Sequence, residues 1–470
     1  MKLILRQKIW LTIIVLTNLL LWVIPSDVVE QVARDRHTML GRYSRSQFSW
    51  MAAVAVVSVV GCYIDWSTGV TYKRRWFQVI ATVLFLLPAL AIADFGLRSK
   101  DRSHYIKDSL AYHRPPGAQF RGTYVDQPQA KRTYPNAPGG FPSIECTLST
   151  DARGFRNPTA LSKCDVVVLG DSFAEGSNVS DEHAWPAVLG GGSGLSVYNL
   201  GMSGYDPLNY LASLREVGLS LHPRCVLCML YEGNDFRSAK RDDERHSPGW
   251  SQAAKVYVKQ SPVISALDDA LVKAFGPINS RGKAPSLEVL DWLPLAIPPG
   301  EGANAYAFAP KQLTDMYRSE DEFALDPRWL NTRRILEDMH AACRQIDCRL
   351  IVVLAPTKAH VTMPLMVGRL PADKVRTFTA IDYKKDLPEP NVFLPTLMQR
   401  AGARETVVAK WCQRESIPFL GLTAALREAA SAGRQVYYTY DQHWTPTGHT
   451  VVAQAVLTFL LDQKRPGGPE

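Results

Sequence analysis

The chain has 470 residues, of which 46% are hydrophobic and 21% are charged, an ordinary globular composition. This length accommodates one large domain with appendages, or two domains. The net charge of +8 is spread thinly along the chain, which favours contact with anionic lipid or glycan and indicates no nucleic-acid partner.

The first hundred residues are much more apolar than the rest and contain three long hydrophobic runs. The runs cover about residues 9–25, 48–66 and 76–97, and each approaches the ~20 residues that cross a bilayer. Tryptophans lie near the edges of all three, as in an interfacial aromatic belt. A cleaved signal peptide is the competing reading of the first run, but no small-x-small cleavage site is evident and two more runs follow. The sequence therefore predicts a membrane region over residues 1–98 with three transmembrane helices.

Basic residues predict the orientation of these helices. Lys2, Arg6 and Lys8 precede the first run, and residues 73–75 (Lys-Arg-Arg) separate the second from the third. Both segments should be cytoplasmic, although the first loop also carries arginines mixed with acidic residues. We therefore expect a multi-pass protein of the bacterial inner (plasma) membrane, with the chain after about Leu97 in the periplasm.

Eight cysteines are present, and all but Cys62 would then meet an oxidising compartment. Some could pair there, but spacing does not reveal which. No Cys–His array has zinc spacing, and we expect neither a metal nor an organic cofactor.

The outer part of the chain reads as a linker followed by one α/β domain. Residues 99–150 are rich in Pro, Gly, Tyr and Arg without a sustained period, and are predicted to be a linker and lead-in loops. Short apolar runs then alternate with amphipathic helical patterns, as in parallel α/β folds. The predicted strands are 165–169, 196–200, 225–231, 349–355 and 417–422. We expect a three-layer αβα sandwich over residues 151–465, with an insertion at about 237–328 that caps the site.

A polar or glycine-containing segment follows each of the first three strands. These segments are Gly170–Asp171–Ser172, "NLGMSGYD" with Gly201, and "YEGNDF" with Asn234. The carboxyl ends of parallel strands share one edge, so the three segments should converge. Near the C-terminus lies "YDQHWTPTGH", which contains Asp441 and His443.

The residues in these segments are suited to acyl transfer by a serine. A serine hydroxyl is a weak nucleophile and needs a base, so Ser172 could lose its proton to His443, with Asp441 orienting the imidazole. The oxyanion formed on an acyl carbonyl needs preorganised donors. The backbone N–H groups of Ser172 and Gly201 and the side-chain amide of Asn234 are suitable donors.

The four blocks, in this order over about residues 150–465, resemble the SGNH (GDSL) hydrolase superfamily. The resemblance implies a flavodoxin-like sheet, Ser172 as nucleophile, His443 as base, and an oxyanion hole made by Ser172, Gly201 and Asn234. Most SGNH esterases have Asp-x-x-His, whereas here Asp441 stands two residues before His443. This Asp-x-His-Trp spacing is similar to that in SGNH-like domains of alginate and related polysaccharide O-acetyltransferases.

Three further residues belong to the blocks. Asp171 and Asp235 are expected to support the site or to contact substrate, with structural roles at turns more frequent for such residues. Trp444 is expected to pack in the core or to form a wall of the acyl pocket.

Several other polar residues have competing readings. His449 is an alternative base, although a surface position in the first turn of a helix is favoured for it. A metal site formed by Asp441, His443 and His449 fits no strong template. Lys358 and His360 follow a predicted strand and could line the cleft, although a surface loop is favoured.

We expect an extracytoplasmic serine-dependent hydrolase that removes acyl (acetyl) groups from a cell-envelope glycan or lipid through an acyl-serine intermediate. The close alternative is an O-acyltransferase that moves an acyl group to a polysaccharide hydroxyl, with a separate membrane acyl-donor protein as partner. A non-catalytic, membrane-anchored glycan-binding protein is the second alternative.

Overall fold

The computed structural model describes residues 70–100, 111–126, 139–236, 304–383 and 385–463, with short stretches between residues 9 and 64 and at 279–280 and 295–297. The chain divides into two compact units. The first is Met1–Ser103 with Ser247–Ala284, and the second is His104–His246 with Pro285–Glu470.

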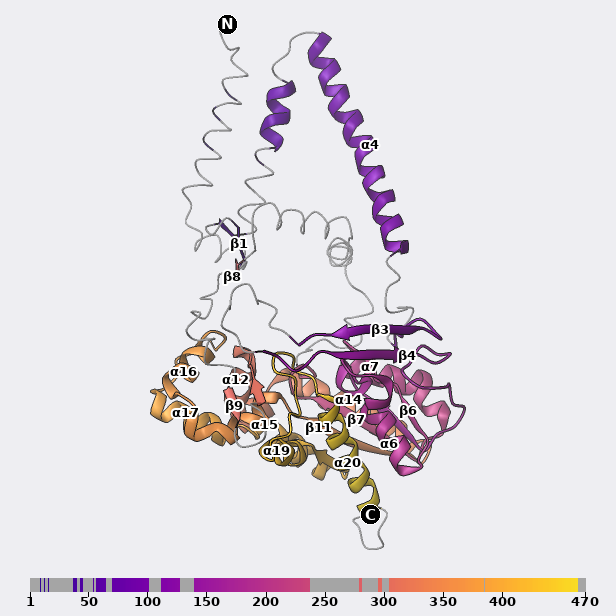
Figure 1. Cartoon of the computed structure of the whole chain (residues 1–470). Coiled ribbons are helices and arrows are strands. Elements are labelled where there is room, and N and C mark those ends of the chain that lie inside the picture. The colour runs from indigo at the N-terminus through magenta and orange to yellow at the C-terminus, as the bar shows by residue number, and fades with distance from the viewer. Residues whose placement is uncertain are drawn as a thin grey trace. The chain divides into compact units, whose positions relative to one another are not determined.

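A five-stranded parallel sheet forms the centre of the second unit (Figure 1). The strands are β5 (Val166–Leu169), β6 (Val197–Asn199), β7 (Cys225–Tyr231), β11 (Arg349–Ala355) and β12 (Phe419–Gly421). Their spatial order is β12-β11-β7-β5-β6, which is the flavodoxin-like doubly wound order. All five strands predicted from short apolar runs are confirmed. The order reverses between β5 and β7, where such sheets bind their ligands.

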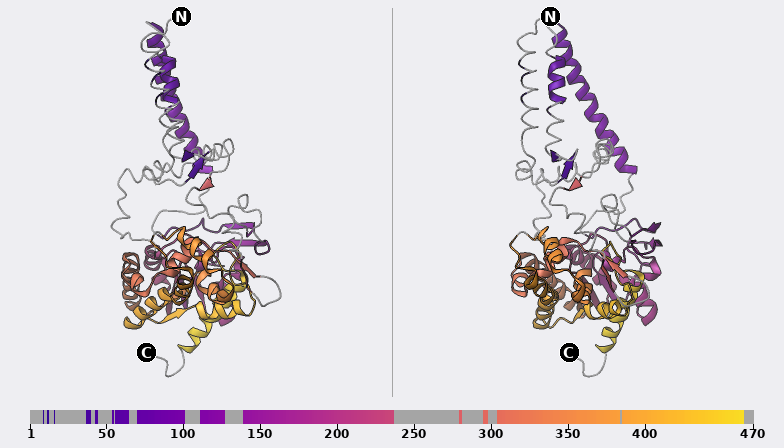
Figure 2. Two further views of the ribbon diagram at one scale, coloured as in Figure 1. Left: turned by 90° about the vertical axis from the view of Figure 1, so that its left-hand side faces the viewer. Right: turned by 60° about the vertical axis from the view of Figure 1, so that its left-hand side comes forward.

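Helices cover both faces of this sheet, because successive strand residues point to opposite sides. Val166 and Val168 of β5 belong to one hydrophobic cluster, and Val167 and Leu169 to another. The first cluster includes residues of α6 (Trp185–Ser193), α12 (Pro310–Tyr317), α15 (Lys358–Thr362), α16 (Ala372–Ala380), α17 (Pro390–Gln399), α19 (Thr423–Ser431) and α20 (Pro446–Asp462). The second includes residues of α7 (Pro207–Ser213), α13 (Glu320–Ala324), α14 (Pro327–Arg344) and α18 (Ala403–Arg414). The predicted three-layer α/β architecture is thus confirmed, and Figure 2 shows it from two further sides.

One long helix is described in the first unit. Helix α4 (Val70–Lys100) contains the whole apolar run 76–97. Within the described residues, no helix combines the length and the apolar character that a membrane crossing requires. Most of the run at 9–25 lies outside the described residues, and in the run at 48–66 only Val54 and residues 56–64 are described, as helix. The assignment of three transmembrane helices therefore stays a prediction.

The segment 99–150 is not only a linker with loops. It contains an antiparallel pair, β3 (Gln119–Tyr124) and β4 (Ile144–Ser149), in which Gln119 lies opposite Ser149. The prediction of loops was wrong here because both strands are half-exposed and polar, without the apolar run that marks a buried strand.

The far end of the predicted insertion, 237–328, also belongs to the α/β body. Helices α12 and α13 contribute Leu313, Met316 and Phe323 to the two cores. Most of residues 237–303 lie outside the described residues, so the predicted cap stays a prediction. All eight cysteines are free thiols, so the pairing that the sequence left open is not present among them.

Candidate active site

The candidate nucleophile lies in a tight turn directly after β5. Ser172 opens the short helix α5 (Ser172–Glu175), and the side chain of Asp171 caps this helix by accepting the Phe173 N–H at 2.9 Å. A Cβ atom at Gly170 would lie 2.6 Å from the Ala174 Cβ, so this position needs glycine. Ser172 stays partly exposed while the next three residues are buried. The turn therefore presents the serine hydroxyl at the carboxyl edge of the sheet.

A continuous hydrogen-bonded chain joins Ser172, His443 and Asp441. The Ser172 Oγ lies 2.7 Å from the His443 Nε2, and the His443 Nδ1 lies 2.5 Å from the Asp441 Oδ1. The same carboxylate oxygen accepts the backbone N–H of His443 at 2.7 Å. Because a carboxylate can only accept, Nδ1 carries a proton and Nε2 is free to accept the serine proton. The structure thus brings together the three predicted catalytic side chains.

Asp441 is held in its charged form. Burial by itself would raise its pKa, but the hydrogen bonds and charge of His443, together with the charge of Lys358, lower the pKa of Asp441 to about 2. Asp441 is therefore ionised at any physiological pH and can stabilise the imidazolium that forms when His443 takes a proton.

This lowered pKa predicts a pH-dependent contribution of Asp441 to stability. Its pKa is below the unfolded value of about 3.9, so the contribution is complete above that pH and disappears as pH falls through about 2. We expect the wild type to be more stable than Asp441→Asn at pH 5, with the difference shrinking toward pH 2. Urea unfolding of both proteins at pH 5, 4 and 3 measures it. A difference independent of pH would contradict the ionised pairing.

Two of the three predicted oxyanion donors are available. The Ser172 N–H, in the first turn of α5, has no acceptor among the described residues. The Asn234 Nδ2 donates to the Asp171 Oδ2 at 2.8 Å, which orients the amide and leaves its second hydrogen free. Both groups follow strands that flank the point of strand-order reversal.

Asp171 accepts the Asn234 amide, and neither Asp171 nor Asp235 is exposed to a substrate, since each is at most 1% exposed. Asp235 accepts the Tyr210 hydroxyl at 2.8 Å and the Tyr231 N–H at 2.6 Å. Burial raises the pKa of Asp171, and burial together with the nearby Asp171 charge raises that of Asp235 well above its usual range. The sequence left open whether Asp171 and Asp235 support the site or contact substrate, and their burial favours a supporting role.

Gly201 does not offer the third donor. Its N–H donates to the Asn199 Oδ1 at 2.9 Å, and a Cβ there would lie 2.5 Å from the Ala174 Cβ. This glycine is needed because the chain passes close to α5. Among the described residues, every other N–H between residues 200 and 206 has an acceptor except that of Gly204, which is exposed and has a φ of +84°. Gly204 is therefore the backbone donor that this loop leaves free.

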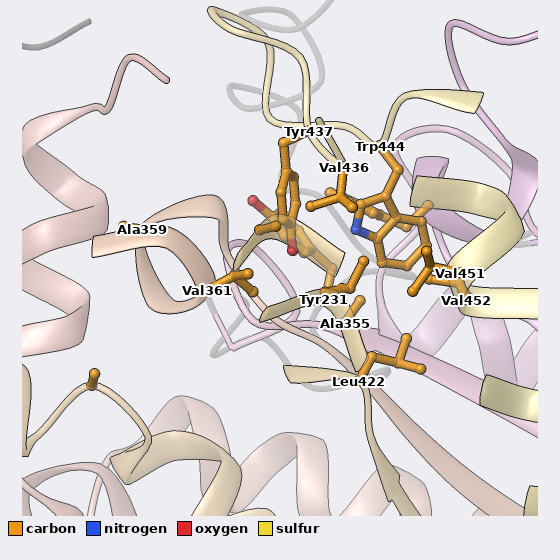
Figure 3. Packing of buried hydrophobic residues seen from close by; sticks show 14 of the residues in the cluster. Tyr231, Ala355, Ala359, Val361, Leu422, Val436, Tyr437, Trp444, Val451 and Val452 are labelled. Atoms are coloured by element: carbon orange, nitrogen blue, oxygen red, sulfur yellow. The ribbon is translucent and has the colours of Figure 1, made fainter. Parts of the chain in front are cut away.

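Aromatic packing fixes the ring of His443. Phe173 stacks on Tyr231 at a centroid distance of 4.0 Å, and lies 4.9 Å from the His443 ring and 4.8 Å from Trp444. Trp444 is fully buried and packs beside aliphatic residues of α20 (Figure 3). Trp444 is thus a core residue and not an exposed wall of the site.

The favoured surface position for His449 was wrong. His449 is 1% exposed, and its Nδ1 accepts the Trp185 N–H at 3.4 Å. Its ring also meets Trp444 edge-on, which explains the burial. The imidazole bonded to Ser172 is that of His443. Within the described residues, no group of three or more His, Cys, Asp or Glu is arranged to hold a metal.

The favoured surface position for Lys358 and His360 was also wrong, since they are 1% and 2% exposed. His360 Nδ1 lies 3.1 Å from the buried Glu232 Oε2, and Lys358 bonds to backbone carbonyls beside Asp441. Asp126, which bonds to the same backbone, was missed entirely. The position of "APTKAH" at a strand end was the only sequence feature that pointed toward the site for any of them.

These contacts define the class of the protein. A serine, an imidazole and a carboxylate, bonded in series at the carboxyl edge of a parallel sheet, form the machinery of a serine-dependent acyl-transfer enzyme. Residues 394–469, which include Asp441 and His443, match a family model described as the SGNH hydrolase-like domain of acetyltransferase AlgX. Over this segment the chain resembles the SGNH hydrolase-like domain of AlgX-type acetyltransferases, and the site has the residues of an ester-acting hydrolase or a related O-acetyltransferase.

Several solved structures are similar to the chain at low identity. A member of the lipolytic G-D-S-L family from Veillonella parvula DSM 2008 is 9% identical, with a TM-score of 0.29, and the match covers 63% of this chain and 96% of that one. A catalytic mutant of Axe2, an acetylxylan esterase from Geobacillus stearothermophilus, is 13% identical, with a TM-score of 0.30 and coverage of 64% and 95%. TesA is 12% identical, with a TM-score of 0.30 and coverage of 63% and 97%. Among curated protein sequences, none matches the chain significantly.

Proposed function

We propose that the protein is an O-acetyltransferase that carries an acyl group on Ser172 and passes it to a hydroxyl of a cell-envelope polysaccharide. The observation that carries the proposal is the Ser172–His443–Asp441 chain, with contacts of 2.7 and 2.5 Å. Hydrogen bonds in this series activate a serine so that it can form and release an acyl-serine ester.

The first half of the reaction loads the serine. The Ser172 Oγ attacks the acyl carbonyl while His443 Nε2 takes its proton, and Asp441 stabilises the resulting imidazolium. The negative charge on the carbonyl oxygen meets the Ser172 N–H and the free hydrogen of the Asn234 amide. The intermediate then collapses, the C–O bond to the leaving group breaks, and His443 returns its proton to that group.

The second half reverses these steps with a new nucleophile. His443 takes the proton of an incoming hydroxyl, which attacks the acyl-serine and releases Ser172. A sugar hydroxyl gives transfer and water gives hydrolysis. The match of residues 394–469 to an acetyltransferase family model favours transfer. Hydrolysis of acyl groups from an envelope glycan or lipid remains the second candidate, since the same residues serve both outcomes.

The proposed location is the outer face of a bacterial inner membrane. It is supported by the three apolar runs and by the basic residues before the first run and at 73–75. Three helices are too few to carry acyl groups across a membrane. We therefore propose a separate membrane acyl-donor protein as the partner.

The test follows the fate of the acetyl group. The full-length protein and Ser172→Ala are incubated with p-nitrophenyl acetate, with and without candidate envelope oligosaccharides, and products are identified by mass spectrometry. Acetate on the sugar with wild type alone supports the transferase. Free acetate with wild type alone supports the hydrolase. If neither product forms and a fluorophosphonate does not label Ser172, the protein is a non-catalytic binder and the proposal fails.

A further inference from the structure

Residues 438–443, which include Asp441 and His443, are here called the catalytic loop. The carboxylate of Asp126, which is far from this loop in sequence, binds its backbone. Asp126, 4% exposed, accepts the N–H groups of Thr439, Tyr440 and Asp441 at 2.8, 3.1 and 3.2 Å. It also accepts the Phe141 N–H at 2.8 Å. One buried carboxylate thus satisfies four backbone donors, three of them in the catalytic loop.

A buried ammonium holds the carbonyl groups of the same loop. The Lys358 Nζ donates to the carbonyl oxygens of Tyr438, Thr439 and Asp441 at 3.1, 2.7 and 2.9 Å. An ammonium has three donors, so all of them are used on this loop. Burial lowers the pKa of Lys358 to about 7, while the charges of Asp126 and Asp441 act in the opposite direction.

The two charges act on the same peptide groups. The Tyr438 carbonyl bonds to Lys358, and the N–H of that peptide group, on Thr439, bonds to Asp126. The next peptide group repeats this arrangement, with the Thr439 carbonyl on Lys358 and the Tyr440 N–H on Asp126. The N–H and C=O of a trans peptide point in opposite directions, so each peptide dipole lies between a negative and a positive charge.

Two aromatic residues close to Asp126 in sequence, Tyr124 and Phe141, pack against Tyr438 of the catalytic loop. The ring of Tyr438 lies 4.7 Å from that of Tyr124 and 5.3 Å from that of Phe141. Burial, followed by the charges of Asp441 and Asp126, raises the pKa of Tyr124. Tyr124, Asp126 and Phe141 therefore belong to the surroundings of the catalytic loop and are not part of a spacer before the domain.

We propose that Asp126 and Lys358 are positioning residues that clamp the catalytic loop, so that Asp441 and His443 meet Ser172 in reactive geometry. The inference rests on the proposed acyl-serine chemistry, because it concerns the same Asp441 and His443. Neither Asp126 nor Lys358 touches Ser172 or His443 directly in the contacts described. Their effect passes through the backbone at Asp441, whose carboxylate orients His443, and small displacements of reacting groups reduce rates steeply.

The test uses the full-length protein with Lys358→Met, Asp126→Asn and the double variant. The control is Lys410→Met, whose side chain is 63% exposed and pairs with Glu320. We expect each single variant to lower kcat for p-nitrophenyl acetate about tenfold or more, with KM changed by about twofold at most. Since both residues act on one loop, the double variant should lose about as much as the worse single variant. Lys410→Met should match the wild type.

Amide hydrogen exchange provides a readout that does not depend on turnover. The amides of Thr439, Tyr440 and Asp441 should be protected in the wild type and exchange faster in both variants. A purely structural role would instead lower global stability without selective exchange in this loop. Asp126→Asn, which keeps the shape of the side chain, carries the test if Lys358→Met does not fold.

The outcomes separate the clamp from the proposed function. If folded variants keep kcat within about twofold of wild type and the three amides exchange no faster, the clamp is refuted while the function stands. If the wild type turns over no ester but exchange at the loop rises in both variants, the clamp stands and the proposed function fails.

Discussion

Replacement of Ser172 by alanine is expected to reduce p-nitrophenyl acetate turnover by about 10⁴-fold or more and to abolish fluorophosphonate labelling. The physical reason is that the Ser172 Oγ is the proposed nucleophile and lies 2.7 Å from the His443 Nε2 that would take its proton. Alanine removes only this oxygen at a partly exposed position, so the fold should persist. Initial rates and intact-protein mass spectrometry after labelling measure the two effects.

Ser220→Ala is the matched control. Its hydroxyl is exposed and donates to the Val217 carbonyl at 2.8 Å, away from the sheet edge that carries the site. This variant should hydrolyse ester and accept the label like the wild type. A Ser172→Ala protein that retained either property would show that another residue is the nucleophile.

Replacement of His443 by alanine is expected to cost nearly as much as the loss of Ser172, about 10³-fold or more in kcat. Without His443 Nε2, no described side chain bonded to the Ser172 hydroxyl can take its proton. Because Ser172 and His443 act as one unit, the double variant should be no slower than the worse single variant. Steady-state kinetics of the two single variants and the double variant measure this directly.

His449→Asn provides the contrast. His449 is buried, and its Nδ1 accepts the Trp185 N–H at 3.4 Å. Asparagine keeps an acceptor near that place, so turnover should persist while the melting temperature falls through loss of packing against Trp444. If His449→Asn lost turnover as His443→Ala does while remaining folded, the assignment of the base would have to change.

Short-range sequence patterns were sufficient to predict the strands of the central sheet and the candidate nucleophile. The five strands are short apolar runs, and β5 is buried at every position, so their burial follows from composition alone. Ser172 and Asn234 follow two of these strands, and the parallel arrangement brings them to one edge. Asp441 and His443 are two residues apart, so their pairing could be predicted from local sequence.

The burial and the partners of Asp126, Lys358, His360 and His449 depend on long-range contacts, which sequence patterns do not reveal. The Asp126 bond to Thr439 spans 313 residues, and the strands next to Asp126 are too polar and exposed to stand out as buried strands. Lys358, His360 and His449 are polar residues whose usual place is the surface, and only partners from distant segments make their burial tolerable.

The sequence by itself determined the order of the five strands of the central sheet along the chain and the candidate catalytic side chains, because apolar runs and strand-end residues are local properties of the chain. Only the tertiary structure decided which backbone donors are used within the protein, since the Gly201 N–H is bonded to the Asn199 Oδ1 while the Gly204 N–H has no acceptor among the described residues. It alone also decided which buried charges hold the catalytic loop. Hydrogen bonds and charge pairs depend on angstrom-scale distances between segments far apart in the chain, and spacing in sequence does not encode those distances.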